Sequence, residues 1–141
     1  PENYGEDVRV LLEAGSMFTG TQYMQALQYR TIFKEEVEEA LKEVDAIVTP
    51  TLPFTALKIG QNKIEIEDGV VEDNLSANMR YTAIASVSGK PALSIPIGFD
   101  RNKMPVGMQL LGRSFEEALL FRIGNAYQSV TEFHTMTPVG M

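Results

Sequence analysis

The first third of the chain carries apolar residues at helical spacing. Apolar positions over residues 8–14 predict a short helix that Gly15 interrupts. A longer apolar stripe then predicts a helix over residues 21–44, with Thr21 as its N-cap. The stripe consists of Tyr23, Ala26, Leu27, Phe33, Val37, Ala40, Leu41 and Val44.

Shorter apolar runs follow, with the spacing of strands. Residues 46–48 are apolar on both sides, which is typical of a central strand covered by helices on both faces of its sheet. We expect Pro50 and Pro53 to end it, because proline cannot donate to a strand ladder. Residues 63–72 alternate around Asp68-Gly69, which predicts a surface hairpin with a type I′ turn.

The second half predicts a helix followed by a pair of strands. The helix covers residues 75–87, and Gly89 ends it. Residues 92–99 and 106–111 then read as strands. A short polar link over residues 100–103 joins them, which favours antiparallel pairing.

The pattern ends with another amphipathic helix. Ser114 and Glu117 have the spacing of a capping box at its start. The predicted fold class is therefore α/β. Three core strands are few for helices of this length, so we expect an incomplete sheet with open edges and possible homo-oligomers. The apolar face of the last helix contains Leu119, Leu120, Ile123, Tyr127 and Val130.

Composition narrows the classes of function. The 141 residues suit one domain, and a hydrophobic content of 44% is ordinary for a globular protein. A net charge of -7 argues against nucleic acid as a partner. No apolar run approaches the length of a membrane span, and no secretion signal is evident, so we expect a cytoplasmic protein. The start at Pro1 without methionine suits an excised piece.

Few residues suggest chemistry of their own. The chain has no cysteine and one histidine, His134, so we expect no clustered transition-metal site and no cofactor. We expect His134 to lie in a flexible tail, which would not hold a catalytic base within hydrogen-bond reach of a nucleophile. Ser88 and Lys90 could form a serine–lysine nucleophile pair. Gly89 and Pro91 explain the same segment as a helix stop and a turn.

The segment after residues 46–48 is the candidate binding element. In open α/β sheets, ligands bind beyond the carboxyl ends of the strands. Thr51, Leu52, Pro53 and Phe54 follow the predicted strand and would form a mainly apolar pocket wall. A rigid turn built by two prolines is the alternative interpretation, and both remain open.

Four motifs follow one another along the chain: Asp45-Ala46-Ile47-Val48-Thr49-Pro50-Thr51, Arg80-Tyr81-Thr82, Gly89-Lys90-Pro91 and Pro105-Val106-Gly107-Met108-Gln109. Together they resemble the C-terminal third of the amidase signature family, whose members are serine hydrolases of amide bonds. The resemblance implies a large mixed sheet flanked by helices, of which residues 1–141 form one C-terminal segment. It also implies a Ser-cis-Ser-Lys mechanism whose residues precede residue 1, so the resemblance assigns no catalytic residue to this chain. The missing N-terminal portion and a small-molecule amide become the expected partners.

The resemblance covers two functional types, general amidases and the A subunit of glutamyl/aspartyl-tRNA amidotransferase. The amidotransferase grips glutamine with an arginine and an aspartate, whose matching positions here are Leu11 and Met79. Neither side chain can pair with a charged group. The resemblance therefore favours an amidase for a less polar substrate, with Met79 in the pocket wall. Two alternatives remain: the amidotransferase, or a non-catalytic structural or binding fragment.

Overall fold

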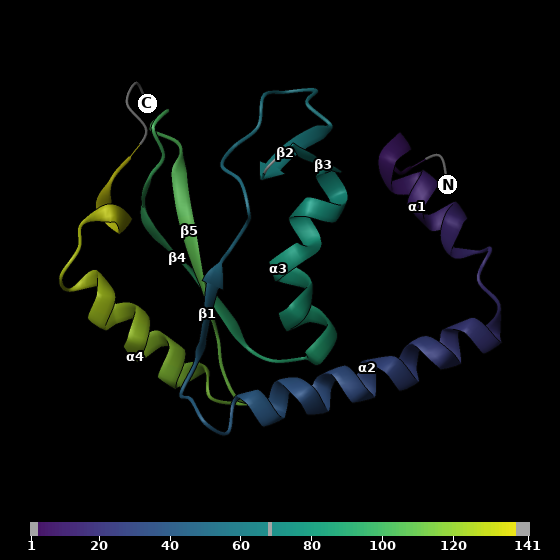
Figure 1. The fold of residues 1–141 in the computed structure, drawn as a ribbon, viewed down its shortest axis with the longest axis horizontal. Coiled ribbons are helices and arrows are strands. Elements are labelled where there is room, and N and C mark those ends of the chain that lie inside the picture. Colours follow the sequence, from purple (N-terminus) through teal and green to yellow (C-terminus); the bar gives the residue numbers. More distant parts are fainter. Residues whose placement is uncertain (1–2, 68, 138–141) are drawn as a thin grey trace.

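The computed structural model describes residues 3–67 and 69–137, and it confirms the α/β class (Figure 1). Over these residues no helix has both the length and the apolarity needed to cross a membrane. The elements are α1 (Glu6–Gly15), α2 (Gly20–Ala40), β1 (Ile47–Pro50), β2 (Lys63–Glu67), β3 (Val70–Asp73), α3 (Asn74–Ser88), β4 (Ala92–Phe99), β5 (Pro105–Leu111), α4 (Glu117–Gln128) and the 3-10 turn η1 (Phe133–Thr135).

The main sheet has the order β1-β5-β4, and both strand pairs are antiparallel. The predicted pairing of the two late strands is confirmed. The expectation of a central strand over residues 46–48 is wrong for the described residues, because β1 pairs with β5 alone and Val48 is 58% exposed. β1 ends at Pro50, as predicted, and Pro50 is its last paired residue, opposite Met108. An edge strand tolerates proline because its outer side needs no donor.

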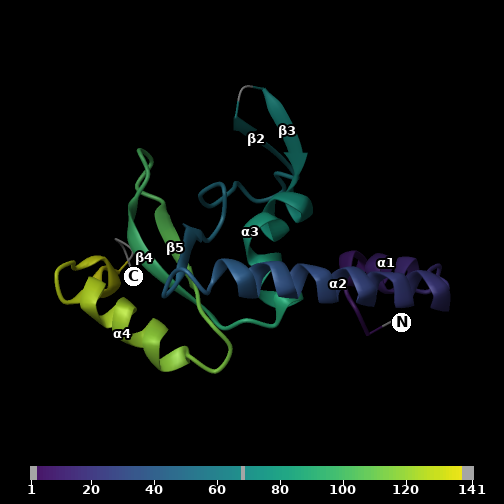
Figure 2. The ribbon, with the colours of Figure 1, turned by 60° about the horizontal axis from the view of Figure 1, so that its bottom comes forward.

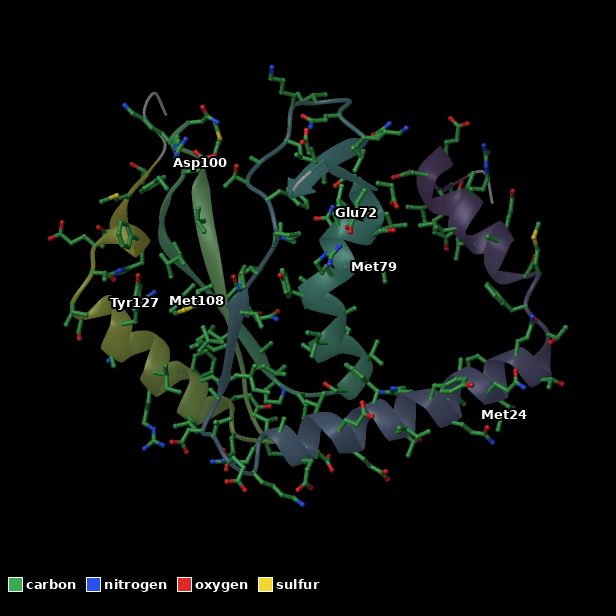
Figure 3. The ribbon with its side chains drawn as sticks, viewed as in Figure 1. Met24, Glu72, Met79, Asp100, Met108 and Tyr127 are labelled. Atoms are coloured by element: carbon green, nitrogen blue, oxygen red, sulfur yellow. The ribbon has the colours of Figure 1, made fainter. Side chains whose placement is uncertain are left out.

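Helices cover the two faces of this sheet (Figure 1). On one face Leu120 of α4 packs against Ile95 and Leu110 of the sheet, and Figure 3 shows Met108 and Tyr127 in the same layer. Helices α2 and α3 lie on the other side, where Val37, Leu41 and Leu111 form a second cluster. The alternation of strand side chains divides the apolar residues between the two clusters.

Helix α2 starts and ends earlier than the sequence predicts. Thr19, not Thr21, is the N-cap, in a reciprocal capping box with Gln22. The helix ends at Ala40 rather than at residue 44. The Arg113 guanidinium donates to the carbonyl of Leu41, the C-cap of the helix, and to the carbonyl of Val44 in the segment that follows.

Helix α3 agrees with the predicted helix over residues 75–87. The Asp73 side chain accepts from the Ser76 amide at its start. The Ser76 hydroxyl, followed by the Ser76 amide, lowers the pKa of Asp73. Gly89 closes the helix at φ 69°, a left-handed conformation that glycine adopts without steric cost. The Arg30 side chain from α2 donates to the carbonyl of Val87 and ties the two helices together.

The predicted hairpin is confirmed as β2 and β3, which pair antiparallel and project beyond α3 in Figure 2. Gly69 has φ 78°, as the second residue of a type I′ turn requires. The turn type depends also on Asp68, which lies outside the described residues. Arg80 on α3 forms an ion pair with Glu72 on β3 and anchors the hairpin.

The start of α4 and the tail correct two expectations. Helix α4 begins at Glu117 without a side-chain cap. Ser114 does not cap it, because the Ser114 hydroxyl accepts a hydrogen bond from Lys90 instead. The predicted flexible tail instead forms the turn η1, in which the Phe133 ring packs edge-on against Phe99 with the ring centroids 6.3 Å apart. His134 is nevertheless exposed.

The chain folds back between α1 and α2, so that α1 lies next to the end of α2 that is farthest from the sheet (Figures 1 and 2). None of its residues is buried. Its large apolar side chains are therefore open, together with several at the start of α2. These exposed residues are Val8, Val10, Leu11, Leu12, Met17, Phe18, Tyr23 and Met24.

Candidate functional site

A hollow of about 770 Å³ lies between the segment after β1 and the strands β4 and β5. It contains four of the predicted wall residues, Thr51, Leu52, Pro53 and Phe54. Met79 lies on α3, is 52% exposed and does not line the hollow (Figure 3). The other lining residues are Pro50, Thr55, Ala56, Tyr81, Ser94, Ile95, Pro96, Pro105, Val106 and Gly107.

The wall segment over residues 51–56 is fixed at its first residue. The Thr51 amide donates to the Gly107 carbonyl at 2.9 Å, which continues the β1–β5 ladder. The Thr51 hydroxyl lies 2.6 Å from the Ser94 hydroxyl on β4. Thr51 follows directly on β1 and is bonded to both β5 and β4, so the position of the first wall residue is fixed.

The same segment is fixed again at Thr55. Its hydroxyl donates to one carboxylate oxygen of Asp100 at 2.7 Å, and the other oxygen accepts from the amides of Asn102 and Met104 at 2.8 Å each. Asp100 lies at the β4–β5 turn (Figure 3). The Thr55 hydroxyl, followed by the Met104 amide, lowers the pKa of the Asp100 carboxyl. The charged carboxylate thus holds the turn and the wall together.

This geometry predicts an acid-dependent loss of stability that Asp100→Asn reduces. A lowered folded-state pKa gives stability that is complete above the unfolded pKa of about 3.9 and is lost as the pH falls through the folded pKa. We expect Asp100→Asn to have a lower thermal midpoint than the wild type at pH 7, and the difference between the two midpoints to shrink as the pH falls below about 3.9. Thermal unfolding between pH 3 and 7 measures this.

Thr55→Val is the matched variant for this prediction. It removes the largest single cause of the lowered pKa but leaves the amide donors of the turn in place. We expect a smaller change in the same direction. A difference between Asp100→Asn and the wild type that stays constant across the whole pH range would contradict the role given to the carboxylate.

A buried glutamine supports the wall from behind. Gln109 on β5 donates to the Thr49 hydroxyl at 3.3 Å and to the Tyr81 carbonyl at 3.2 Å. These bonds join β5, β1 and α3, and so place Tyr81 at the hollow. Tyr81 and Ser94 are not among the predicted lining residues. Ser94 is the polar position between two apolar residues of β4, and Tyr81 belongs to the Arg80-Tyr81-Thr82 motif.

The hypothesis of a Ser88–Lys90 nucleophile pair does not fit the structure. The Ser88 hydroxyl donates to the Ile84 carbonyl at 2.6 Å. The Lys90 ammonium group, on a side chain 3% exposed, donates to Glu38 at 2.6 Å and to Ser114 at 2.9 Å. This ion pair also lowers the pKa of Glu38, with the Lys90 hydrogen bond as the main cause. Both side chains therefore have structural partners.

The lining of the hollow consists of apolar side chains and hydroxyl groups. Within residues 3–67 and 69–137 it contains no charged residue, and its hydroxyl groups come from Thr51, Thr55, Tyr81 and Ser94. The same part of the chain has no group of three or more histidine or acidic side chains that could hold a metal ion.

Known proteins share both the sequence and the fold of the chain. The family pattern named Amidase matches residues 1–121. The chain is 37% identical over 138 residues to an amidase of Pseudomonas putida, covering 98% of this chain and 29% of that protein. It is 42% identical over 138 residues to the A subunit of glutamyl-tRNA(Gln) amidotransferase from Clostridium novyi (strain NT), covering 94% of this chain and 27% of that protein.

A solved amidase structure has the same fold, with a TM-score of 0.85 and 30% identity. The match covers 92% of this chain and 29% of that one. The chain thus spans less than a third of the length of the relatives it matches. The resemblance found in the four motifs is confirmed, and the chain belongs to the amidase family.

Proposed function

We propose that residues 1–141 are the C-terminal segment of an amide-hydrolysing enzyme and form one wall of its substrate pocket. The observation that carries this proposal is the hollow itself, which over the described residues is lined by apolar side chains and hydroxyl groups and by no charged side chain. Membership of the amidase family supplies the reaction class. The match to only 29% of the Pseudomonas putida amidase leaves room for the reacting groups elsewhere.

In this proposal a Ser-cis-Ser-Lys mechanism resides in an N-terminal portion that packs on this chain. Two features of the described residues support a further packing partner. Strands β1 and β4 each pair with β5 alone, so each has an edge without a strand. Helix α1 exposes its apolar residues, which are stabilised only when something covers them.

A general amidase is the favoured activity, and the glutamine-dependent amidotransferase is the second candidate. Leu11 and Met79 lack the charge needed to grip a glutamine substrate, which favours a neutral amide. The second candidate rests on the 42% identity to the Clostridium novyi protein. Release of ammonia by the intact protein from neutral aliphatic and aryl amides, compared with release from glutamine, distinguishes the two.

We predict that the isolated 141 residues hydrolyse none of these amides. The Ser88 hydroxyl and the Lys90 ammonium group have structural partners, so neither is free to act as nucleophile or base. Ammonia release by the purified segment should equal the buffer blank. Turnover that survives repurification and disappears in Ser88→Ala would contradict the proposal, and so would an intact protein that hydrolyses no amide.

A further inference from the structure

The hydroxyl pair of Thr51 and Ser94 holds a donor that the fold does not use. We propose that this pair is a polar subsite for a neutral oxygen acceptor in the part of the substrate away from the scissile amide. The inference rests on the proposed function and names the class of substrate: an uncharged amide with an apolar or aromatic body and an additional carbonyl or ether oxygen.

The two hydroxyl groups have one more hydrogen than the bond between them uses. The two hydroxyl oxygens are 2.6 Å apart, so one O–H donates to the other oxygen. Two hydroxyls carry two hydrogens, and the second needs another acceptor. Among residues 3–67 and 69–137, the only side-chain hydrogen bond of Thr51 or Ser94 is the one between them. The second O–H is therefore available at the surface of the hollow, which both residues line.

The donor is held in place before a ligand arrives. The Thr51 amide is bound to the Gly107 carbonyl, and Ser94 lies opposite Gln109 within the β4–β5 ladder. The chain has glycine at position 107, where a Cβ would lie 2.9 Å from the Thr51 hydroxyl and 3.3 Å from that of Ser94. The absence of a side chain there leaves the space in which the two hydroxyls meet.

The surroundings select a neutral acceptor. The described lining is otherwise mostly apolar, with Leu52, Phe54 and Ile95 among its members, and contains no charged side chain. A charged ligand group would lose hydration without gaining an ion pair. A carbonyl or ether oxygen loses less hydration free energy than a charged group, and a hydrogen bond from the free O–H compensates for that loss. One directed donor in an apolar wall is the arrangement by which pockets fix the orientation of a ligand.

Matched substrates test this subsite in the intact protein. The pairs are 4-acetylbenzamide with 4-isopropenylbenzamide and 4-methoxybenzamide with 4-ethylbenzamide, together with their 3-substituted analogues. Each pair exchanges an oxygen acceptor for carbon at similar size. We expect the wild type to favour the oxygen member of at least one pair by roughly three- to tenfold in kcat/KM, the value of one neutral hydrogen bond.

The variant Thr51→Val/Ser94→Ala removes both hydroxyls and keeps the apolar lining. The preference should fall to about one, because the donor is gone, and the rates with the carbon members measure any general change that the variant makes to the wall. Each single variant keeps one hydroxyl and should retain part of the preference. Ser86→Ala is the matched control, since Ser86 is exposed on α3, bonds within that helix and does not line the hollow.

Two results would overturn the subsite: no preference in the wild type for any pair, or a preference that persists in the double variant. Failure of the proposed function gives a different result, since then no benzamide is hydrolysed. In that case ligand-observed NMR of the same pairs with the wild type and the double variant measures binding. Equal binding of both members by the wild type would then overturn the subsite.

Discussion

Leu110→Ala lowers the free energy of unfolding by about 2–5 kcal/mol, the range for a leucine truncated in a packed core. Leu110 is 1% exposed and lies on β5, the central strand of the sheet. It packs with Ile95 on β4 and Leu120 on α4. The loss combines the transfer energy of the removed atoms with the cavity that a sheet held on both sides cannot close. Urea denaturation of the intact protein measures it.

Val48→Ala is the control for this prediction, because Val48 lies directly opposite Leu110 in the β1–β5 register. Val48 is 58% exposed on an edge strand of the described residues. If the proposed N-terminal portion leaves Val48 uncovered, we expect its truncation to change the unfolding free energy by less than about 1 kcal/mol. A loss as large for Val48 as for Leu110 would show that β1 is covered in the intact protein. A negligible loss for Leu110 would contradict the core described here.

The parts of the fold that the sequence predicts well depend on neighbours along the chain. The pairing of β4 with β5 follows from two apolar runs joined by a short polar link. The end of α3 at Gly89 follows from a glycine in the left-handed conformation. In both cases the deciding contacts lie a few residues apart, so local rules are sufficient.

The predictions that are wrong concern positions where a residue distant in sequence, or a second suitable residue nearby, determines the structure. Ser114 and Glu117 satisfy the local rule for a capping box, yet Lys90 takes the Ser114 hydroxyl from 24 positions away. Thr19 and Thr21 both suit an N-cap, and the reciprocal bonds with Gln22 select Thr19. The place of β1 at the edge depends on its pairing with β5, which no local pattern encodes.

The candidate site shows the same division. Thr51 to Phe54 are predictable, because a proline-rich segment after a strand is a recognisable position for a binding wall. Ser94 lies 43 positions from Thr51, and its role appears only when the sheet brings the two hydroxyls together. Asp100 likewise meets Thr55 from 45 positions away. Without pairing information, a serine in an apolar strand and an aspartate in a turn are ordinary residues.

Gly107→Ala should destabilise the protein by about 1–3 kcal/mol and raise KM for a neutral amide by roughly tenfold or more. The added Cβ would lie 2.9 Å from the Thr51 hydroxyl oxygen and 3.2 Å from the Thr51 Cβ. Thr51 cannot move freely, because its amide is bonded to the Gly107 carbonyl. The new methyl group must therefore separate the hydroxyl pair or displace the wall over residues 51–56, and either change alters the hollow. Thermal unfolding and steady-state kinetics of the intact protein measure the two effects.

Gly20→Ala separates this steric effect from the general consequences of replacing glycine. An added Cβ at Gly20, the first residue of α2, meets nothing within 4 Å. Alanine there should leave the unfolding free energy unchanged or raise it by up to about 1 kcal/mol, since it restricts the unfolded chain, and KM should not change. A side chain at position 107 would contact both Thr51 and Ser94. If Gly107→Ala nevertheless had the same stability and KM as Gly20→Ala, the wall would not depend on the close packing of Gly107 against these two residues. The pocket would then have to be formed by other residues than those of this hollow.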